Sequence, residues 1–258
     1  MNMLSLAMRN LLRNHRRSLT TLLAMLIGVV TVLIFGGYSG YIKLGLQTGY
    51  VRDSGHLQIQ QQDYFLYGSG NPAAYGIKNY THIMQVVQND PILKPMLAVV
   101  TPTLTLGGIA GNFNEGLSRT VIGTGVVVEE QNKMRLWNEY GLPQRPYQMA
   151  LTSTADNAVV IGTGVARTLQ LCQALKVKNC PHKQVSRQAS AAAPNDITAL
   201  SQQESSSTTS GMPRVELLAA NSHGAPNVAA LDVVKAELHG VKEYDDILVT
   251  LHLAQAQK

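Results

Sequence analysis

An uncharged apolar stretch from Ser18 to Ile42 constrains this chain more than any other part of its sequence. Eleven of the residues from Leu19 to Phe35 are Leu, Ile, Val or Phe. As a helix rising about 1.5 Å per residue, the whole stretch would be about 37 Å long, enough to cross a hydrocarbon core of about 30 Å. The sequence therefore predicts a transmembrane helix over residues 18–42 that anchors the protein in a membrane.

The distribution of charge around this stretch predicts its orientation. Residues 1–50 contain no acid but five basic residues, namely Arg9, Arg13, Arg16, Arg17 and Lys43. The formal net charge of the whole chain is +5, so the remaining residues are balanced. Because basic flanks stay on the cytoplasmic side, we expect the N-terminus in the cytoplasm and residues 43–258 outside, in the periplasm if the cell is Gram-negative. The excess charge is a topology signal and does not indicate nucleic-acid binding.

A cleaved signal peptide is the alternative interpretation of the same stretch. Its apolar part is longer than the 7–15 residues typical of a signal peptide, and no A-x-A-like cleavage site follows it. Residues 1–17 precede it as an amphipathic pattern with arginines on the polar side. This pattern predicts a short helix on the cytoplasmic surface of the membrane, in contact with lipid headgroups.

Beyond the anchor, the pattern predicts a mixed α+β domain over residues 43–258. The helix of the anchor can continue as a short stalk until Gly55 ends it. Low-complexity residues 184–211, rich in Ala, Ser, Gln, Thr and Pro, are predicted as a flexible surface loop. Helices are expected at 80–89, at 126–141 and after Gly164, and strands at 56–61, 119–125, 159–161, 214–220, 228–238 and 245–251.

Two Gly-Thr-Gly triplets, at 123–125 and 162–164, are candidates for a dinucleotide-binding turn. The second triplet follows an apolar strand and opens a helix. The nucleotide fingerprint needs a third glycine, however, and Arg167 stands at that position. A tight strand-to-helix turn explains the triplet without a ligand. No phosphate-binding loop of the G-x-x-x-x-G-K-[ST] type is present in the sequence, so no cofactor is expected.

The other candidate chemical groups are two cysteines and an acidic cluster. Cys172 and Cys180 could form a disulfide in an oxidising compartment or remain two free thiols. His182 lies near them, but no second pair of ligands has the spacing of a zinc site. Glu243, Asp245 and Asp246 could serve acid–base chemistry or bind calcium, although a solvated turn before a strand is the favoured interpretation. No catalytic or metal-binding motif is found, and the sequence predicts that the protein is not an enzyme.

Three segments together resemble a known family. They are LAMRNLLRNHRRSLTTLLAMLIG around the start of the span, VVIGTGVARTLQL in the external domain, and GVKEYDDILVTLHLAQAQ near Lys258. This set is similar to the permease subunits of ABC transporters of the MacB, FtsX and lipoprotein-releasing (Lol) type. The resemblance implies an α+β periplasmic core domain, often divided into two lobes, between the first and second of four spans. The chain would then be the first half of such a permease.

The resemblance also implies a function and partners. The permease would be non-catalytic and would couple a separate ATPase subunit to the periplasmic domain, for export or lipoprotein release, beside a second copy or a paralogue. The first span would act as a lever, and three glycines near its exit would offer a hinge: Gly36, Gly37 and Gly40. The competing hypothesis is a stand-alone, membrane-anchored periplasmic binding or scaffold protein.

Overall fold

We describe a computed structural model of the protein, which covers residues 3, 5, 8, 9, 13–143, 146–178, 180, 212–221 and 224–258. The fold class α+β is confirmed, with one long apolar helix near the N-terminus followed by mixed helices and strands. The chain divides into two compact units. The first unit comprises residues 1–56 and 137–145, and the second comprises residues 57–136 and 146–258.

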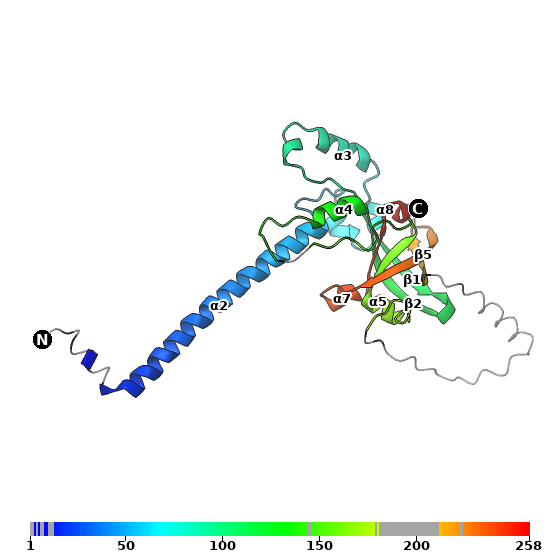
Figure 1. The fold of residues 1–258 in the computed structure, drawn as a ribbon. Coiled ribbons are helices and arrows are strands. Elements are labelled where there is room, and N and C mark those ends of the chain that lie inside the picture. The colour runs from blue at the N-terminus through cyan, green and yellow to red at the C-terminus, as the bar shows by residue number, and fades with distance from the viewer. Residues whose placement is uncertain are drawn as a thin grey trace, which may run out of the picture. The chain divides into compact units, whose positions relative to one another are not determined.

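Helix α2 (His15–Ser54) dominates the first unit and is drawn from blue to cyan in Figure 1. Its 40 residues give a length of about 60 Å. It contains all of residues 18–42, begins three residues before them, and continues beyond them as a stalk. The helix ends where the sequence predicts: Gly55 has a φ of 78°, and its N–H bonds to the carbonyl of Val51.

The prediction for residues 1–17 falls partly outside the described residues, and the prediction for 184–211 falls wholly outside them. His15, Arg16 and Arg17 already belong to α2. The loop prediction for 184–211 lies entirely outside the part of the chain that the structure describes.

The second unit is built on a closed six-stranded barrel, which the sequence did not predict. Its strand order is β1-β2-β6-β3-β5-β4, and β4 pairs with β1 to complete the ring. The β2–β6 and β3–β5 pairs are parallel, whereas the other neighbours are antiparallel. The strands are β1 (Thr103–Asn112), β2 (Leu117–Val126), β3 (Ala158–Gly162), β4 (Arg214–Ala220), β5 (Pro226–Glu237) and β6 (Leu248–His252).

Short helices connect and cap these strands. Their bounds are η1 (Tyr64–Gly68), η2 (Pro72–Tyr75), α3 (Tyr80–Asn89), η3 (Lys94–Met96), η4 (Phe113–Glu115), α4 (Val128–Arg135), α5 (Thr163–Thr168), α7 (Lys242–Asp245) and α8 (Leu253–Ala256). Helices α5 and α7 contact each other, and Figure 1 shows them side by side.

Strand β3 is buried on both of its faces, which explains its uninterrupted apolar sequence. Val159 and Ile161 lie in the main core, together with inward-facing residues of the other strands and the apolar residues of α5. Ala158 and Val160 lie in a second cluster with residues such as Leu151. In β4, β5 and β6, fully buried positions alternate with more accessible ones, as burial on one face requires.

Four of the predicted elements are wrong or too long. The strand predicted over 245–251 begins only at Leu248, because Asp245 is the last residue of α7. Residues 56–61 form no strand: Leu57 is 92% exposed and Ile59 is 60% exposed, so the alternating pattern has no sheet to pack against. Helix α4 ends at Arg135 instead of Gly141. The helix after Gly164 was expected to place Val165, Leu169 and Cys172 on one face, but α5 ends at Thr168. Gln170 takes a left-handed φ of 55°, which an α-helix does not accommodate.

The first Gly-Thr-Gly triplet lies inside β2, where its glycines make room for packing. A Cβ added at Gly123 would collide with the side chain of Leu106. One added at Gly125 would collide with Ala256 of α8, the helix that follows β6. This triplet is therefore a packing feature of a narrow barrel and not a nucleotide-binding turn.

Candidate functional site

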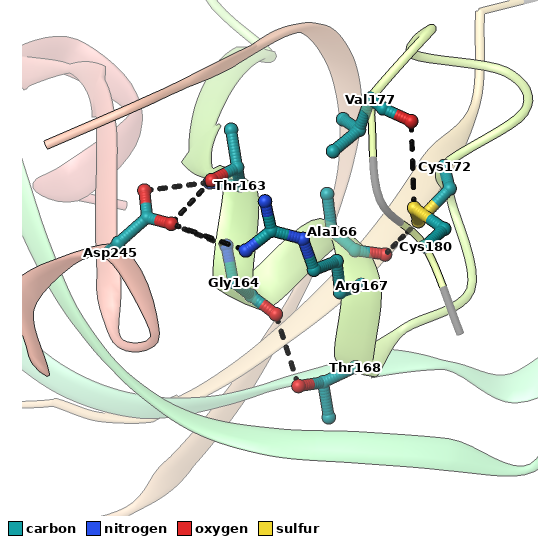
Figure 2. The surroundings of a disulfide bond; sticks show 9 residues. All are labelled: Thr163, Gly164, Ala166, Arg167, Thr168, Cys172, Val177, Cys180 and Asp245. Carbon is teal, nitrogen blue, oxygen red and sulfur yellow. Dashed lines mark hydrogen bonds and ion pairs between the residues drawn. A yellow bond between two sulfur atoms is a disulfide. The ribbon is translucent and has the colours of Figure 1, made fainter. Parts of the chain in front are cut away.

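The second and third segments that carry the family resemblance meet at one place in the second unit. Strand β3 pairs with β6 in antiparallel register, with Ile161 opposite Val249. The end of β3, the turn at Gly162 and the start of α5 therefore lie beside the entrance to β6, where α7 is located. Figure 2 shows the result: the side chain of Asp245 points from the end of α7 to the first turn of α5. We call this contact the Asp245 junction.

The carboxylate of Asp245 is held by hydrogen bonds from three residues. The backbone N–H groups of Thr163 and Gly164 donate to it at 3.0 Å each, and the Thr163 hydroxyl also donates. The backbone N–H of His239 donates at 3.3 Å. Two cationic or titratable groups lie slightly farther away, Arg167 Nη1 at 3.9 Å and His239 Nδ1 at 3.7 Å. Asp245 thus caps α5 from a distant part of the chain.

These contacts keep the carboxylate ionised. Burial by itself would raise the pKa of Asp245, since the residue is only 3% exposed. The hydrogen bonds from Thr163, His239 and Gly164 stabilise the charged form and outweigh burial, so the pKa lies below its ordinary value. An ionised carboxylate also suits the positive end of the peptide dipoles in α5.

The Asp245 junction corrects one interpretation of the sequence and supports another. A solvated turn is wrong for Asp245, although Glu243 beside it is exposed. The strand-to-helix turn at 162–164 is confirmed. The N–H donors that a phosphate would need at that turn are already used by Asp245, so the geometry does not favour a nucleotide there.

Both glycines of this turn are required by close approach. A Cβ added at Gly162 would collide with the backbone carbonyl of Asp245. A Cβ added at Gly164 would collide with the side chain of Asp246. The two sequence segments are therefore fitted to each other at the level of the backbone, in addition to their hydrogen bonds.

Cys172 and Cys180 form a disulfide after α5, with Cα atoms 6.2 Å apart (Figure 2). The sequence left this open between a disulfide and two free thiols. Leu169 and Cys172 are buried even though α5 has already ended, so the segment after the helix still packs on the barrel. The disulfide fastens Cys180 to this packed segment.

We expect reduction of the disulfide to destabilise the second unit. In the chain-entropy model, a closed loop of this size contributes about 2.5 kcal/mol. The paired variant Cys172→Ser and Cys180→Ser should therefore lower the melting temperature by about 5–10 °C. Calorimetry of the oxidised protein, the reduced protein and the double variant measures this effect. Equal melting temperatures for all three would contradict the prediction.

Helix α2 is long and apolar enough to be the predicted membrane anchor. It contains an eighteen-residue stretch apolar enough to cross a membrane, and none of that stretch is buried in the protein. The helix passes without interruption through Gly36, Gly37 and Gly40, where added Cβ atoms would meet no other atoms. The hinge at these glycines remains a prediction.

The far end of α2 carries contacts that did not stand out in the sequence. Arg52 Nε donates a 2.8 Å hydrogen bond to the carbonyl of Trp137, and the rings of His56 and Trp137 pack edge to face with centroids 5.1 Å apart. Trp137 is the sole tryptophan of the chain, and this was the one feature of the sequence that could have singled out the position. Because Trp137 was expected inside a helix over 126–141, the sequence gave no reason to place it in a loop against α2.

A cavity of about 270 Å³ lies at the end of the barrel near α8, with a mainly apolar lining. Its polar lining groups bond to one another: Asn227 donates to the carbonyl of Lys258, and Lys258 donates to Gln255. Among the described residues, no group of three or more His, Cys, Asp or Glu side chains is placed to hold a metal ion.

No protein-family model matches the chain, and no curated protein matches it in sequence.

Proposed function

We propose that this chain is a non-catalytic permease subunit of an ABC transporter of the MacB, FtsX and lipoprotein-releasing type. It would couple the motion of a separate ATPase subunit to its external domain, for export or lipoprotein release. The observation that carries the proposal is the Asp245 junction. The second and third segments that resemble the family lie about eighty positions apart in sequence, yet they are joined there by hydrogen bonds to one buried carboxylate.

The geometry of α2 suits the proposed mechanical role. A continuous helix of 40 residues extends well beyond a hydrocarbon core of about 30 Å, so it can carry a displacement from one side of a membrane to the other. Gly36, Gly37 and Gly40 are the proposed hinge near its exit. The ATPase would supply the motion, and the external domain, divided into two lobes in this proposal, would use it.

The proposed location is a bacterial inner membrane, with the N-terminus in the cytoplasm and the external domain in the periplasm. The basic residues before the span support this orientation. The disulfide between Cys172 and Cys180 supports an oxidising compartment for the second unit. The proposed partners are an ABC ATPase, a second permease copy or paralogue, and membrane lipid, without nucleic acid.

Affinity purification of the natural gene product from its host membranes tests the proposal. In a mild detergent, we expect an ATPase with a phosphate-binding loop to co-purify in near-stoichiometric amount, identified by mass spectrometry. The natural protein with a helix-breaking substitution in the span, Val30→Pro, is the control and should not retain the ATPase. Recovery of the natural protein without any ATPase would refute the proposed function.

A stand-alone anchored binding or scaffold protein is the second candidate. It is favoured by the closure of the barrel within this chain, because all six strands and both core clusters come from residues 103–252. The sequence of the gene beyond residue 258 distinguishes the candidates: three further apolar spans would refute the second one.

A further inference from the structure

The cavity beside α8, which we call the α8 cavity, lies within the second unit. Its inner wall is formed by Leu106 of β1, Leu217 of β4 and Leu251 of β6, which belong to the main core and are each at most 6% exposed. Helix α8 contacts β1, β2 and β6 at this end of the barrel. The cavity is therefore an extension of the main core towards the surface, and a molecule that enters it meets an apolar wall.

Three alanines leave this space unfilled. Ala219, Ala229 and Ala256 line the cavity and pack against the main core, each with a single methyl group. Larger side chains at such positions would fill the space and stabilise the fold, because protein interiors are normally close-packed. An apolar cavity of about 150 Å³ is large enough for benzene, so one of about 270 Å³ has room for about eight to ten carbon atoms.

The rim of the α8 cavity is polar and positively charged. The carbonyl of Lys258 accepts a 2.8 Å hydrogen bond from the side-chain amide of Asn227, and its N–H donates to the carbonyl of Gln255 at 3.3 Å. These bonds fix the backbone of Lys258 at the rim, where its ammonium lies 3.5 Å from Gln255 Oε1. No Asp or Glu is among the described residues that line the cavity. The rim therefore favours an anionic group over a cationic one.

We propose that the α8 cavity binds a medium-chain carboxylate, with an aliphatic tail of about eight to ten carbon atoms. The tail packs against Leu106, Leu217 and Leu251, and burial of its methylene groups supplies most of the affinity. The carboxylate stays at the rim, where the ammonium of the exposed Lys258 attracts it and water still reaches it. Such binding needs neither an ATPase nor a second subunit, and so it is separate from the proposed function.

Methyl NMR of the leucine-labelled full chain, reconstituted in phosphatidylcholine nanodiscs, tests this site with octanoate as the probe. The methyl signals of Leu106, Leu217 and Leu251 should shift and saturate below the concentration at which octanoate forms micelles. Those of Leu151, which lies in the second core cluster, should stay in place. From hexanoate to decanoate the affinity should rise about fourfold for each added CH2, and it should level off for longer tails that exceed the cavity.

Two pairs of variants separate the contributions of the cavity and of the charge. Ala229→Leu fills the cavity and should abolish the saturable shifts, whereas Ala230→Leu changes the next, exposed position of β5 outside the lining and should bind as the parent does. Lys258→Gln should weaken octanoate binding about two- to fivefold but leave the binding of 1-octanol, which has the same tail without the charge, unchanged. Lys235→Gln, which removes an exposed lysine of β5 outside the cavity, should change neither.

The signals of Leu151 show in each variant whether the fold is retained, and Lys258→Gln changes an exposed residue that the fold does not depend on. Shifts that do not saturate, or that are equally large in the parent and in Ala229→Leu, would overturn the proposed site. An equal effect of Lys258→Gln on octanoate and on 1-octanol would overturn the assignment of the ligand as a carboxylate.

Discussion

Replacing Asp245 by asparagine should lower the free energy of unfolding of the second unit by about 3–5 kcal/mol. The substitution keeps the shape of the side chain but removes the charge that Thr163, Gly164 and His239 stabilise. One carboxylate oxygen is also replaced by an NH2 group, which cannot accept the hydrogen bonds that the oxygen accepted. Calorimetry should show the melting temperature falling by about 10 °C or more.

The matched control for this variant is Glu243→Gln. Glu243 carries the same charge on the same short helix but is exposed, so its replacement should change stability by about 0.5 kcal/mol or less. Equal stability of the two variants would mean that Asp245 does not hold α5 in place.

The effect of Asp245→Asn should also depend on pH. An unfolded aspartate titrates at about pH 3.9, and the pKa of the folded carboxylate lies below that value. Its contribution is therefore fully present above about pH 4 and is lost as the pH falls through the folded pKa. The stability difference between the parent protein and Asp245→Asn should shrink below about pH 4 and stay constant between about pH 5 and 7.

Replacing Gly162 by alanine should destabilise the same junction by about 3 kcal/mol, by a steric route that does not involve charge. The added Cβ would collide with the backbone carbonyl of Asp245, which cannot rotate away as a side chain could. Either β3 or α7 must shift, and a shift of either one lengthens the hydrogen bonds at the carboxylate. We expect a fall of about 8 °C in melting temperature, with no dependence on pH above about pH 5.

Gly107→Ala provides the control for this substitution. Gly107 also lies in a barrel strand, but a Cβ added there would meet no atom within 4 Å, so the variant should be neutral or slightly stabilising. If Gly162→Ala were as stable as Gly107→Ala, the close approach of α7 to β3 would be refuted. Because Asp245→Asn and Gly162→Ala act on adjacent groups, their effects should not be additive.

Elements with strong local patterns could be predicted from the sequence. The apolar stretch and Gly55 together indicated an extended α2 and its end, and the bounds of α3 match the expected 80–89. The strands near 159–161, 214–220 and 228–238 were also expected, because alternation or continuous apolar character depends only on neighbouring residues.

The closed barrel and the Asp245 junction could not be predicted in this way. Barrel closure depends on which distant strands pair, and nothing in a local pattern specifies that β1 meets β4 or that β2 meets β6. The carboxylate of Asp245 resembles its exposed neighbours in sequence, and only the pairing of β3 with β6 brings it against α5. Burial of a charge by tertiary structure has no signature at the position itself.

The strand order of the barrel has a consequence for the time course of folding. Strands β1 and β2 form a hairpin that can pair as soon as both are synthesised. Their other partners come much later in the chain: Gly108 of β1 pairs with Ala219, roughly a hundred positions away, and Ile122 of β2 pairs with Leu248. Until the last strand arrives, both sides of the hairpin expose unpaired backbone groups that other chains can bind. The barrel is thus a structure of high contact order, and its β1–β2 hairpin is exposed to aggregation throughout synthesis of the residues that follow it.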